Sequence, residues 1–303
     1  MNLAAYQIEY SRSLRSMIDA HLYEAIGRSH PPRINDAMKH AVGGGKRIRP
    51  MLVVISCAVA GGSEREALDA AIAVELLHTS SLIHDDIMDV SEMRRGRQTL
   101  QTLYDIPTAI LTGDAMIALA MRAIHKVQSP RRDAILDVFT TAFVQTCEGQ
   151  GYDLELSGRD NIDAATHDAM VENKTAKLVE ASAAVGALIG TADQHVVDLL
   201  RRFALNIGIA YQVQDDLLDV LGDEKTTGKP NGQDRKNGRS TYLSLAHPKP
   251  HVDTFTTEAT AARLSALVSQ YTISACSTLD SLPPAPAREY LRSLAGSLAD
   301  RRM

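Results

Sequence analysis

The sequence is poor in the residues that build aromatic cores and cross-links. It has no tryptophan, and aromatic residues make up 4% of its 303 residues, whereas hydrophobic residues make up 45%. The core must therefore be aliphatic, a composition that favours helices. The three cysteines are far apart and form no Cys-x-x-Cys pair, which argues against a disulfide framework and a thiolate zinc site. We expect reduced thiols in a cytoplasmic protein.

Long apolar runs and a large excess of one charge are also missing. No run approaches the roughly eighteen apolar residues that a transmembrane helix needs. Charged residues interrupt the apolar positions from Met1 to Asp19, so we expect neither a transmembrane segment nor a signal peptide. The net charge of −5 argues against general nucleic-acid binding but leaves room for a local basic site that binds an anionic substrate.

Apolar residues recur at three- and four-residue steps along most of the chain, and almost no segment alternates as a strand would. We predict an all-α fold: a single domain over residues 1–303, built as a bundle of about ten helices around a central cavity. The predicted helices cover residues 3–26, 34–42, 51–60, 64–90, 107–127, 131–156, 163–189, 193–221, 252–279 and 287–299, with a short one at 242–246.

Two acidic clusters of the same pattern stand near the ends of two predicted helices. The first contains Asp85, Asp86 and Asp89, and the second contains Asp215, Asp216 and Asp219. In a helix these carboxylates lie one turn apart and repel one another unless a cation neutralises them. One such cluster is equally well explained as a solvated helix end, but two copies favour a metal site. Mg²⁺ binds carboxylates together with substrate phosphate oxygens, so the pair predicts a diphosphate substrate.

Basic segments accompany both clusters. Lys46, Arg47 and Arg49 follow three glycines at a predicted helix start, where backbone N–H groups and the helix dipole attract anions. Taken alone, these cations would more often be an ordinary basic helix start, but beside two acidic clusters they predict phosphate binding. Residues 94–97 turn basic directly after the first cluster. Residues 222–240, rich in glycine and lysine, predict a mobile lid that closes over phosphate groups.

Taken together, these elements resemble the trans-isoprenyl diphosphate synthases, also called polyprenyl synthetases. The resemblance spans most of the chain and implies the isoprenoid synthase fold and a homodimer. The matching segments, in family order, are Gly44-Gly45-Lys46-Arg47-Ile48-Arg49-Pro50, Glu75-Leu76-Leu77-His78, Asp85 to Asp89 with Arg94-Arg95-Gly96, Gly113-Asp114, Lys174-Thr175, Gln212 to Asp219, and Gly228-Lys229-Pro230.

Two features depart from that family pattern. Arg239 stands where many relatives carry lysine, which keeps the charge but changes the geometry. The first cluster has two residues between its second and third aspartates, whereas bacterial farnesyl synthases commonly have four. The second departure weakens an identification as a bacterial farnesyl synthase.

The resemblance implies a role for each matching residue. An allylic diphosphate would ionise, isopentenyl diphosphate would attack the allylic cation head to tail, and the released diphosphate would take the eliminated proton. Both acidic clusters would hold Mg²⁺, three ions with substrate bound, and Mn²⁺ could replace it. The other implied residues are Lys46, Arg49, His78 and Arg95 for isopentenyl diphosphate, Arg94, Lys174, Lys229 and Arg239 for the allylic diphosphate, and Lys174, Thr175 and Gln212 for catalysis.

Some of these residues also have an ordinary structural interpretation. A histidine in an apolar helix, such as His78, is more often a core residue than a ligand. Lys174 and Thr175 could be exposed helix residues. For these three, only the resemblance favours a functional role.

Product length depends on the residues one or two turns before Asp85. The resemblance implies that Leu77, Ser80 and Ser81 line the pocket for the growing tail. Because both serines are small, we expect elongation past the farnesyl stage to geranylgeranyl diphosphate (C20). Alternatives are a farnesyl or longer-chain synthase, a class I terpene cyclase and a non-catalytic partner subunit. The basic segment at 46–49 argues against a cyclase, and the presence of both clusters argues against a silent subunit.

Overall fold

The structure is a computed structural model that describes residues 3–27, 31–159, 162–191, 193–221 and 254–299. The predicted lid, the short helix predicted at 242–246, Lys229 and Arg239 lie outside the described residues.

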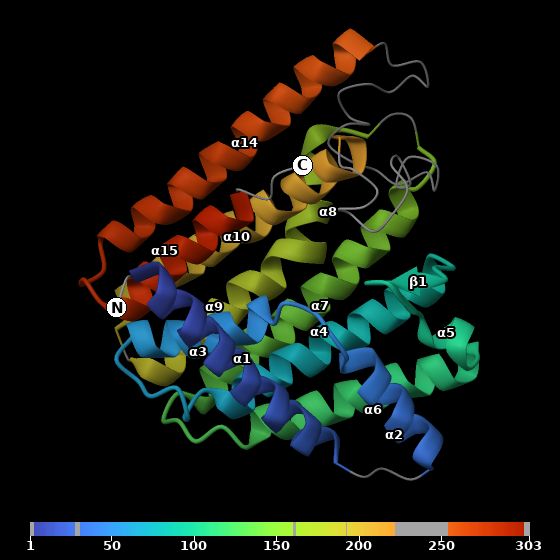
Figure 1. The fold of residues 1–303 in the computed structure, drawn as a ribbon, viewed down its shortest axis with the longest axis horizontal. Coiled ribbons are helices and arrows are strands. Elements are labelled where there is room, and N and C mark those ends of the chain that lie inside the picture. Colours follow the sequence, from blue (N-terminus) through green and yellow to red (C-terminus); the bar gives the residue numbers. More distant parts are fainter. Residues whose placement is uncertain (1–2, 28–30, 160–161, 192, 222–253, 300–303) are drawn as a thin grey trace. The chain divides into compact units, whose positions relative to one another are not determined.

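In the described part of the chain, the regular secondary structure is helical except for one small hairpin, which confirms the predicted all-α class (Figure 1). The hairpin pairs β1 (Met93–Arg94) with β2 (Arg97–Gln98). Up to the hairpin, the helices are α1 (Leu3–Ile26), α2 (Pro32–Val42), α3 (Ile48–Val59) and α4 (Leu68–Met88). After it come α5 (Leu100–Leu103), α6 (Ile106–His125), α7 (Arg132–Leu156), α8 (Ala164–Val171), the π-helical turn η1 (Glu172–Ala176), α9 (Lys177–Gly190), α10 (Gln194–Leu221), α14 (Thr254–Asp280) and α15 (Pro286–Ala299).

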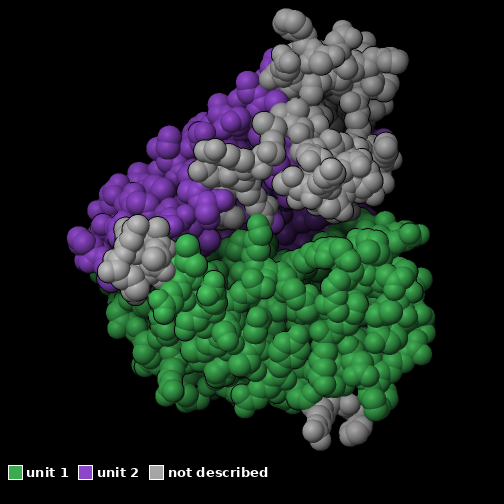
Figure 2. Space-filling model, in the orientation of Figure 1, with its two compact units in different colours: residues 1–139, 182–197 green, residues 140–181, 198–303 purple. Residues whose placement is uncertain are grey.

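The chain divides into two compact units, and each is discontinuous in sequence (Figure 2). Unit 1 comprises residues 1–139 and 182–197, and unit 2 comprises residues 140–181 and 198–303. The boundaries fall within helices α7, α9 and α10, so each of these helices contributes to both units. The single domain over residues 1–303 stays a prediction.

Small and aliphatic side chains fill the core of unit 1, as the composition predicts. Residues Ala70 to Leu77 of α4 are buried, and α3 is buried over most of its length. Gly190 of α9 lies so close to α3 that a Cβ atom there would be 2.5 Å from the Cys57 carbonyl oxygen. In unit 2, Val213 and Leu217 of α10 form a buried cluster with Leu264 and Val268 of α14.

Two predicted helix boundaries are wrong in an informative way. The predicted helix at 51–60 starts earlier, at Ile48, so Pro50 lies inside the first turn. Backbone N–H groups of the first turn have no acceptor within the helix, so the missing N–H of a proline costs nothing there. The helix predicted over 163–189 contains the π-helical turn η1 between α8 and α9. Helix propensity along the chain does not reveal such a turn.

Helix α6 is long and apolar enough to cross a membrane by length and composition, and 39% of its apolar window is buried. It also carries the charged residues Asp114 and Arg122. A Cβ atom on Gly113 of this helix would lie 2.8 Å from a ring carbon of His84 in α4, so the two helices are in close contact. One face of α6 therefore packs against α4.

Candidate active site

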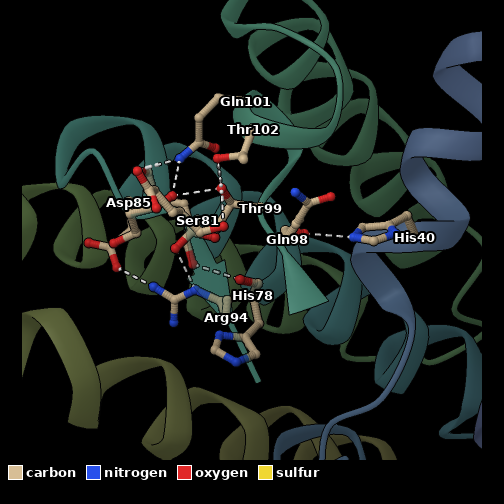
Figure 3. Close-up of polar contacts among 12 residues, drawn as sticks. His40, His78, Ser81, Asp85, Arg94, Gln98, Thr99, Gln101 and Thr102 are labelled. Atoms are coloured by element: carbon tan, nitrogen blue, oxygen red, sulfur yellow. Dashed lines mark hydrogen bonds and ion pairs between the residues drawn. The ribbon is translucent and has the colours of Figure 1, made fainter. Parts of the chain in front are cut away.

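The first acidic cluster lies at the carboxyl end of α4, with Asp85 and Asp86 in the last turn and Asp89 as the C-cap. A helix carries partial negative charge at this end, so three carboxylates here are unfavourable without cations. Arg94 supplies one positive charge: its Nε donates to Asp86 Oδ1 at 2.6 Å and its Nη2 to Asp85 Oδ2 at 3.1 Å (Figure 3). One arginine leaves a net negative cluster of hard oxygen ligands, which fits Mg²⁺.

The β1–β2 hairpin presents the basic residues that follow the cluster. Arg95 and Gly96 form its two-residue turn with φ values of 53° and 73°, the positive values that a type I′ turn requires. The next residue, Arg97, fixes the hairpin to α2, because its Nη1 donates to the His40 carbonyl oxygen at 3.0 Å. His40 Nδ1 accepts a second bond from Arg97, and its Nε2 donates to the Gln98 carbonyl oxygen at 2.8 Å.

The basic trio predicted for phosphate binding separates into two kinds of residue. Arg47 is buried and adopts a left-handed conformation with φ 55°. Its guanidinium donates to Asp19 at 2.7 Å, to Glu75 at 2.6 Å and to the carbonyl oxygen of Val42. Arg47 therefore holds α1, α3 and α4 together and is not available to a phosphate. Lys46 is exposed, whereas Arg49 is partly buried.

Three of the four residues predicted to bind isopentenyl diphosphate lie together in unit 1. Arg49 Nη1 lies 3.2 Å from His78 Nε2, which fits an arginine donor and a neutral imidazole acceptor. Burial lowers the pKa of His78 well below its usual value, and Arg49, Arg95 and Arg94 lower it further. The guanidinium of Arg95 occupies the space beside Gly45 that a Cβ atom would fill. The fourth residue, Lys46, is exposed next to Gly45.

In unit 2, the predicted catalytic residues form two hydrogen-bonded groups. Lys174 Nζ donates to Asp153 Oδ2 at 2.6 Å. Thr175 Oγ1 donates to Gln212 Oε1 at 2.9 Å, and Gln212 Nε2 donates to Asp216 Oδ1 at 2.9 Å. A continuous chain of hydrogen bonds thus joins Thr175 to the second acidic cluster.

The π-helical turn η1 carries Lys174 and Thr175, and two glycines allow helices to pack directly against it. On α7, a Cβ atom at Gly149 would lie 2.5 Å from Lys174 Cα. On α10, a Cβ atom at Gly208 would lie 2.7 Å from Ala176 Cα. Isolated π turns occur frequently at functional sites, and the sequence carries no clear signal for this one.

The second acidic cluster lies near the end of α10. Asp215 is exposed and Asp216 is buried, with 4% of its surface accessible. Asp219 belongs to α10, but its side chain is outside the described residues. Within the described part of the chain, no three carboxylate, histidine or cysteine side chains converge on a ready-made metal site.

The residues predicted to set product length occupy two faces of α4. Ser81 lies one turn before Asp85 on the same face, and Leu77 lies one turn earlier. Ser80 and Leu77 are buried, whereas Ser81 is partly exposed. Ser80 lies one turn before His84 on the same face of α4, and the ring of His84 packs on Gly113 of α6. Of the two serines, only Ser81 shares the face of the acidic cluster.

Two polar residues outside the predicted site set are linked to it by the structure. Asp153, the partner of Lys174, lies 21 positions before it. Gln101 donates to the backbone carbonyl groups of Asp86, within the first cluster, and of Ser91, just after it. Asp153 ends a polar stretch at residues 148–153 that fits either a cavity lining or an interhelical hydrogen bond, and Gln101 belongs to no motif that the sequence shows.

Comparison with known proteins identifies the family. The polyprenyl synthetase family model matches residues 31–264. The short chain isoprenyl diphosphate synthase of Methanocaldococcus jannaschii is 36% identical over 238 residues, which cover 78% of this chain and 72% of that protein. The geranylgeranyl pyrophosphate synthase of Geoglobus acetivorans is 35% identical over 240 residues, covering 78% of this chain and 74% of that protein.

A solved structure agrees with this assignment over the whole fold. The crystal structure of geranylgeranyl pyrophosphate synthetase from Pyrococcus horikoshii Ot3 superposes with a TM-score of 0.92 at 30% identity, covering 99% of this chain and 100% of that chain. The isoprenoid synthase fold and the family predicted from sequence are thereby confirmed. The chain belongs to the polyprenyl synthetase family of trans-prenyltransferases.

Proposed function

We propose that this chain condenses isopentenyl diphosphate head to tail with an allylic prenyl diphosphate and that its main product is geranylgeranyl diphosphate. The observation that carries the proposal is the acidic end of α4, with Arg94 on its carboxylates and with Arg49, His78 and Arg95 in the same unit. Relatives named as geranylgeranyl synthases support the product.

The two acidic clusters would hold Mg²⁺: Asp85, Asp86 and Asp89 in unit 1, and Asp215, Asp216 and Asp219 in unit 2. We expect three ions with substrate bound, and Mn²⁺ as a working substitute. When bound, the metal supplies Lewis-acid stabilisation of the diphosphate leaving group. In the structure, Arg94 pairs with Asp85 and Asp86. With Mg²⁺ on these carboxylates, the Arg94 guanidinium would be released to contact the allylic diphosphate. Lys229 and Arg239, outside the described residues, stay predicted partners of the same diphosphate.

Isopentenyl diphosphate would bind through Lys46, Arg49 and Arg95. The lowered pKa of His78 keeps its imidazole neutral, so it can accept a hydrogen bond from Arg49 and orient that guanidinium. A neutral histidine adds no further charge to this group of arginines. The residue therefore serves to position Arg49 as well as to contact the diphosphate.

Thr175 and Gln212 would stabilise the allylic cation through their oxygen dipoles. Their orientation is supported by the chain of hydrogen bonds that ends on Asp216. Lys174 is held by Asp153 and would contact the allylic diphosphate. The released diphosphate then takes the proton from the condensed product.

We assign control of product length to Ser81 and, one turn deeper, Leu77. One turn of helix advances about 5.4 Å, roughly the length of an isoprene unit. A tail that passes Ser81 can therefore grow by one unit before it reaches Leu77. Ser81→Phe should shorten the product to the farnesyl stage. An unchanged product distribution would contradict this assignment.

A homodimer in the cytoplasm fits two further observations. The large apolar residues Leu103, Ile106, Ile110 and Leu111 of α5 and α6 are exposed, as a subunit interface would require. The three cysteines are free, and burial raises the pKa of Cys57 to about 12, which keeps that thiol unreactive. Light scattering of the purified protein tests the dimer, which would give twice the 32.9 kDa chain mass.

The decisive assay combines purified protein, Mg²⁺, labelled isopentenyl diphosphate and one of three primers: dimethylallyl, geranyl or farnesyl diphosphate. Chromatography then measures the chain length of the product. We expect elongation of each primer and accumulation of the C20 product. Elongation that stops at C15 would overturn the product assignment, and no elongation of any primer would overturn the proposed function.

A further inference from the structure

A single side chain, Gln101 of α5, holds both ends of residues 86–91, the stretch that joins the last turn of α4 to the hairpin (Figure 3). Its Nε2 donates to the backbone carbonyl oxygen of Asp86 at 2.9 Å and to that of Ser91 at 2.6 Å. Asp86 lies in the last turn of α4, and Ser91 lies two residues before β1. Gln101 thus fixes the backbone where the helix gives way to the basic hairpin.

The bonds of Gln101 belong to a local network that closes the end of α4. The last four carbonyl groups of a helix lack partners within the helix. Here the Asp86 carbonyl accepts from Gln101 and from the Ser91 N–H at 2.9 Å. The Ser91 carbonyl accepts from Gln101 and from Thr99 Oγ1 at 2.6 Å. Gln101 is the side chain common to both carbonyls.

The amide orientation of Gln101 is fixed by these two acceptors. An amide rotated by half a turn would place Oε1 against two carbonyl oxygens. In the orientation observed, Oε1 is buried and has no hydrogen-bond partner among the described residues. A buried acceptor without a partner is unfavourable. The geometry therefore points to the two donated bonds as the function of this side chain.

The segment held by Gln101 connects two groups that must act together. At one end are the carboxylates of Asp85 and Asp86, and at the other is Arg94, whose guanidinium reaches back to both. A shift of the backbone at residues 86–91 would change the distance between the carboxylates and the guanidinium. Gln101 restrains that shift from outside the site.

We propose that Gln101 is a positioning residue for the metal- and allylic-diphosphate-binding end of α4. It acts through the backbone of Asp86 and Ser91 and touches neither metal nor substrate. This inference rests on the proposed function of the first acidic cluster. Mutation of such outer residues around a metal site typically weakens metal affinity or activity by about 10- to 100-fold.

Gln101→Met tests the proposal, because methionine matches the length of glutamine but donates no hydrogen bond. The matched control is Gln98→Met: Gln98 lies on β2, three residues before Gln101, is exposed, and offers its backbone carbonyl to His40. Electron paramagnetic resonance measures Mn²⁺ binding in the presence of inorganic diphosphate, and steady-state kinetics measure KM for each substrate. Circular dichroism verifies that the variants are folded.

We expect Gln101→Met to weaken Mn²⁺ binding and raise KM for the allylic diphosphate by about tenfold or more. KM for isopentenyl diphosphate should stay within about twofold of wild type in Gln101→Met, because the residues predicted to bind that substrate keep their contacts. In Gln98→Met, Mn²⁺ affinity and KM for the allylic diphosphate should also stay within about twofold of wild type, because the Gln101 bonds are intact. Gln101→His, which keeps one N–H donor, should recover part of the Mn²⁺ affinity.

Wild-type Mn²⁺ affinity and allylic KM in Gln101→Met would overturn the inference. So would an equal rise in both KM values, or a Gln101→His variant no better than Gln101→Met, because packing alone would then explain the effect. A separate result would overturn only the proposed function: wild type binds Mn²⁺ and diphosphate more tightly than Gln101→Met but elongates no primer.

Discussion

Replacing Arg47 by methionine should destabilise the chain strongly, because it leaves a buried carboxylate without its ion-pair partner. The side chains of Arg47 and Glu75 are 3% and 5% exposed, and their charged atoms are 2.6 Å apart. Removing one member of a buried ion pair typically costs about 3–5 kcal/mol. At about 2 °C per kcal/mol for a large domain, the melting temperature should fall by about 6–10 °C.

Two further variants separate the ion pair from other effects. Arg33→Met removes the cation of the exposed pair Arg33–Asp105, whose side chains are 51% and 48% exposed, and should cost less than about 1 kcal/mol. The double variant Arg47→Met with Glu75→Leu removes both buried charges and should recover most of the loss, because apolar replacement of a buried pair is often nearly neutral.

The pH dependence of the single Arg47 variant has a definite sign. Burial raises the pKa of Glu75, and Arg47 opposes that shift. Without Arg47 the folded-state pKa rises further above the unfolded value of about 4.3. An acid with a raised folded-state pKa binds its proton more tightly in the folded state, so stability falls as pH rises through that pKa. Arg47→Met should therefore lose less stability at pH 5 than at pH 8.

Thermal melting followed by circular dichroism measures all of these effects. A fall of less than about 2 °C in Arg47→Met would refute the buried-pair interpretation, since a solvated arginine behaves in that way. A double variant as unstable as the single variant would refute the explanation that an unpaired Glu75 causes the loss.

Two other predictions concern His78 and the π-helical turn. The pKa of His78 is lowered in the folded state, so its stabilising contribution is present above about pH 6.5 and is lost as pH falls, by at most about 1.4 kcal/mol per pH unit. His78→Asn should remove this pH dependence of the unfolding free energy, measured by urea titration at several pH values, and an equal pH dependence in both proteins would contradict the prediction. Gly149→Ala should lower the free energy of unfolding by about 1–3 kcal/mol and lower kcat by displacing Lys174. At the control position Gly151 a Cβ atom meets nothing within 4 Å, so Gly151→Ala should raise the free energy of unfolding by about 0.5–1 kcal/mol, and similar melting and activity in both variants would contradict the packing interpretation.

Local pattern was sufficient to predict the long helices and the acidic clusters, but not the short helix α5. The spacing of apolar residues is set by positions three or four apart in the sequence. This local spacing predicted α1 and most of α4 and α10 within a few positions. The repeated aspartate pattern likewise needed only short-range information. The order of motifs along the chain then identified the family.

Features that depend on distant residues could not be predicted in this way. Arg47 looked like its neighbours Lys46 and Arg49, but it pairs with Asp19 and Glu75, each 28 positions away. The π-helical turn packs against Gly149, which lies on another helix. Charge and propensity along the chain do not show which side chain is buried or which helices meet.

The proposed mechanism requires the two acidic clusters to hold Mg²⁺, which would stabilise the diphosphate leaving group of the allylic substrate. The most direct test compares Mg²⁺-dependent elongation of farnesyl diphosphate by wild type, Asp85→Asn and Asp216→Asn, with Asp69→Asn as the control on the exposed start of α4. We expect turnover to fall by about 10²-fold or more in both cluster variants and to stay near wild type in the control. Near-normal turnover in Asp85→Asn or Asp216→Asn at limiting Mg²⁺ would contradict the assignment of these clusters as the metal site.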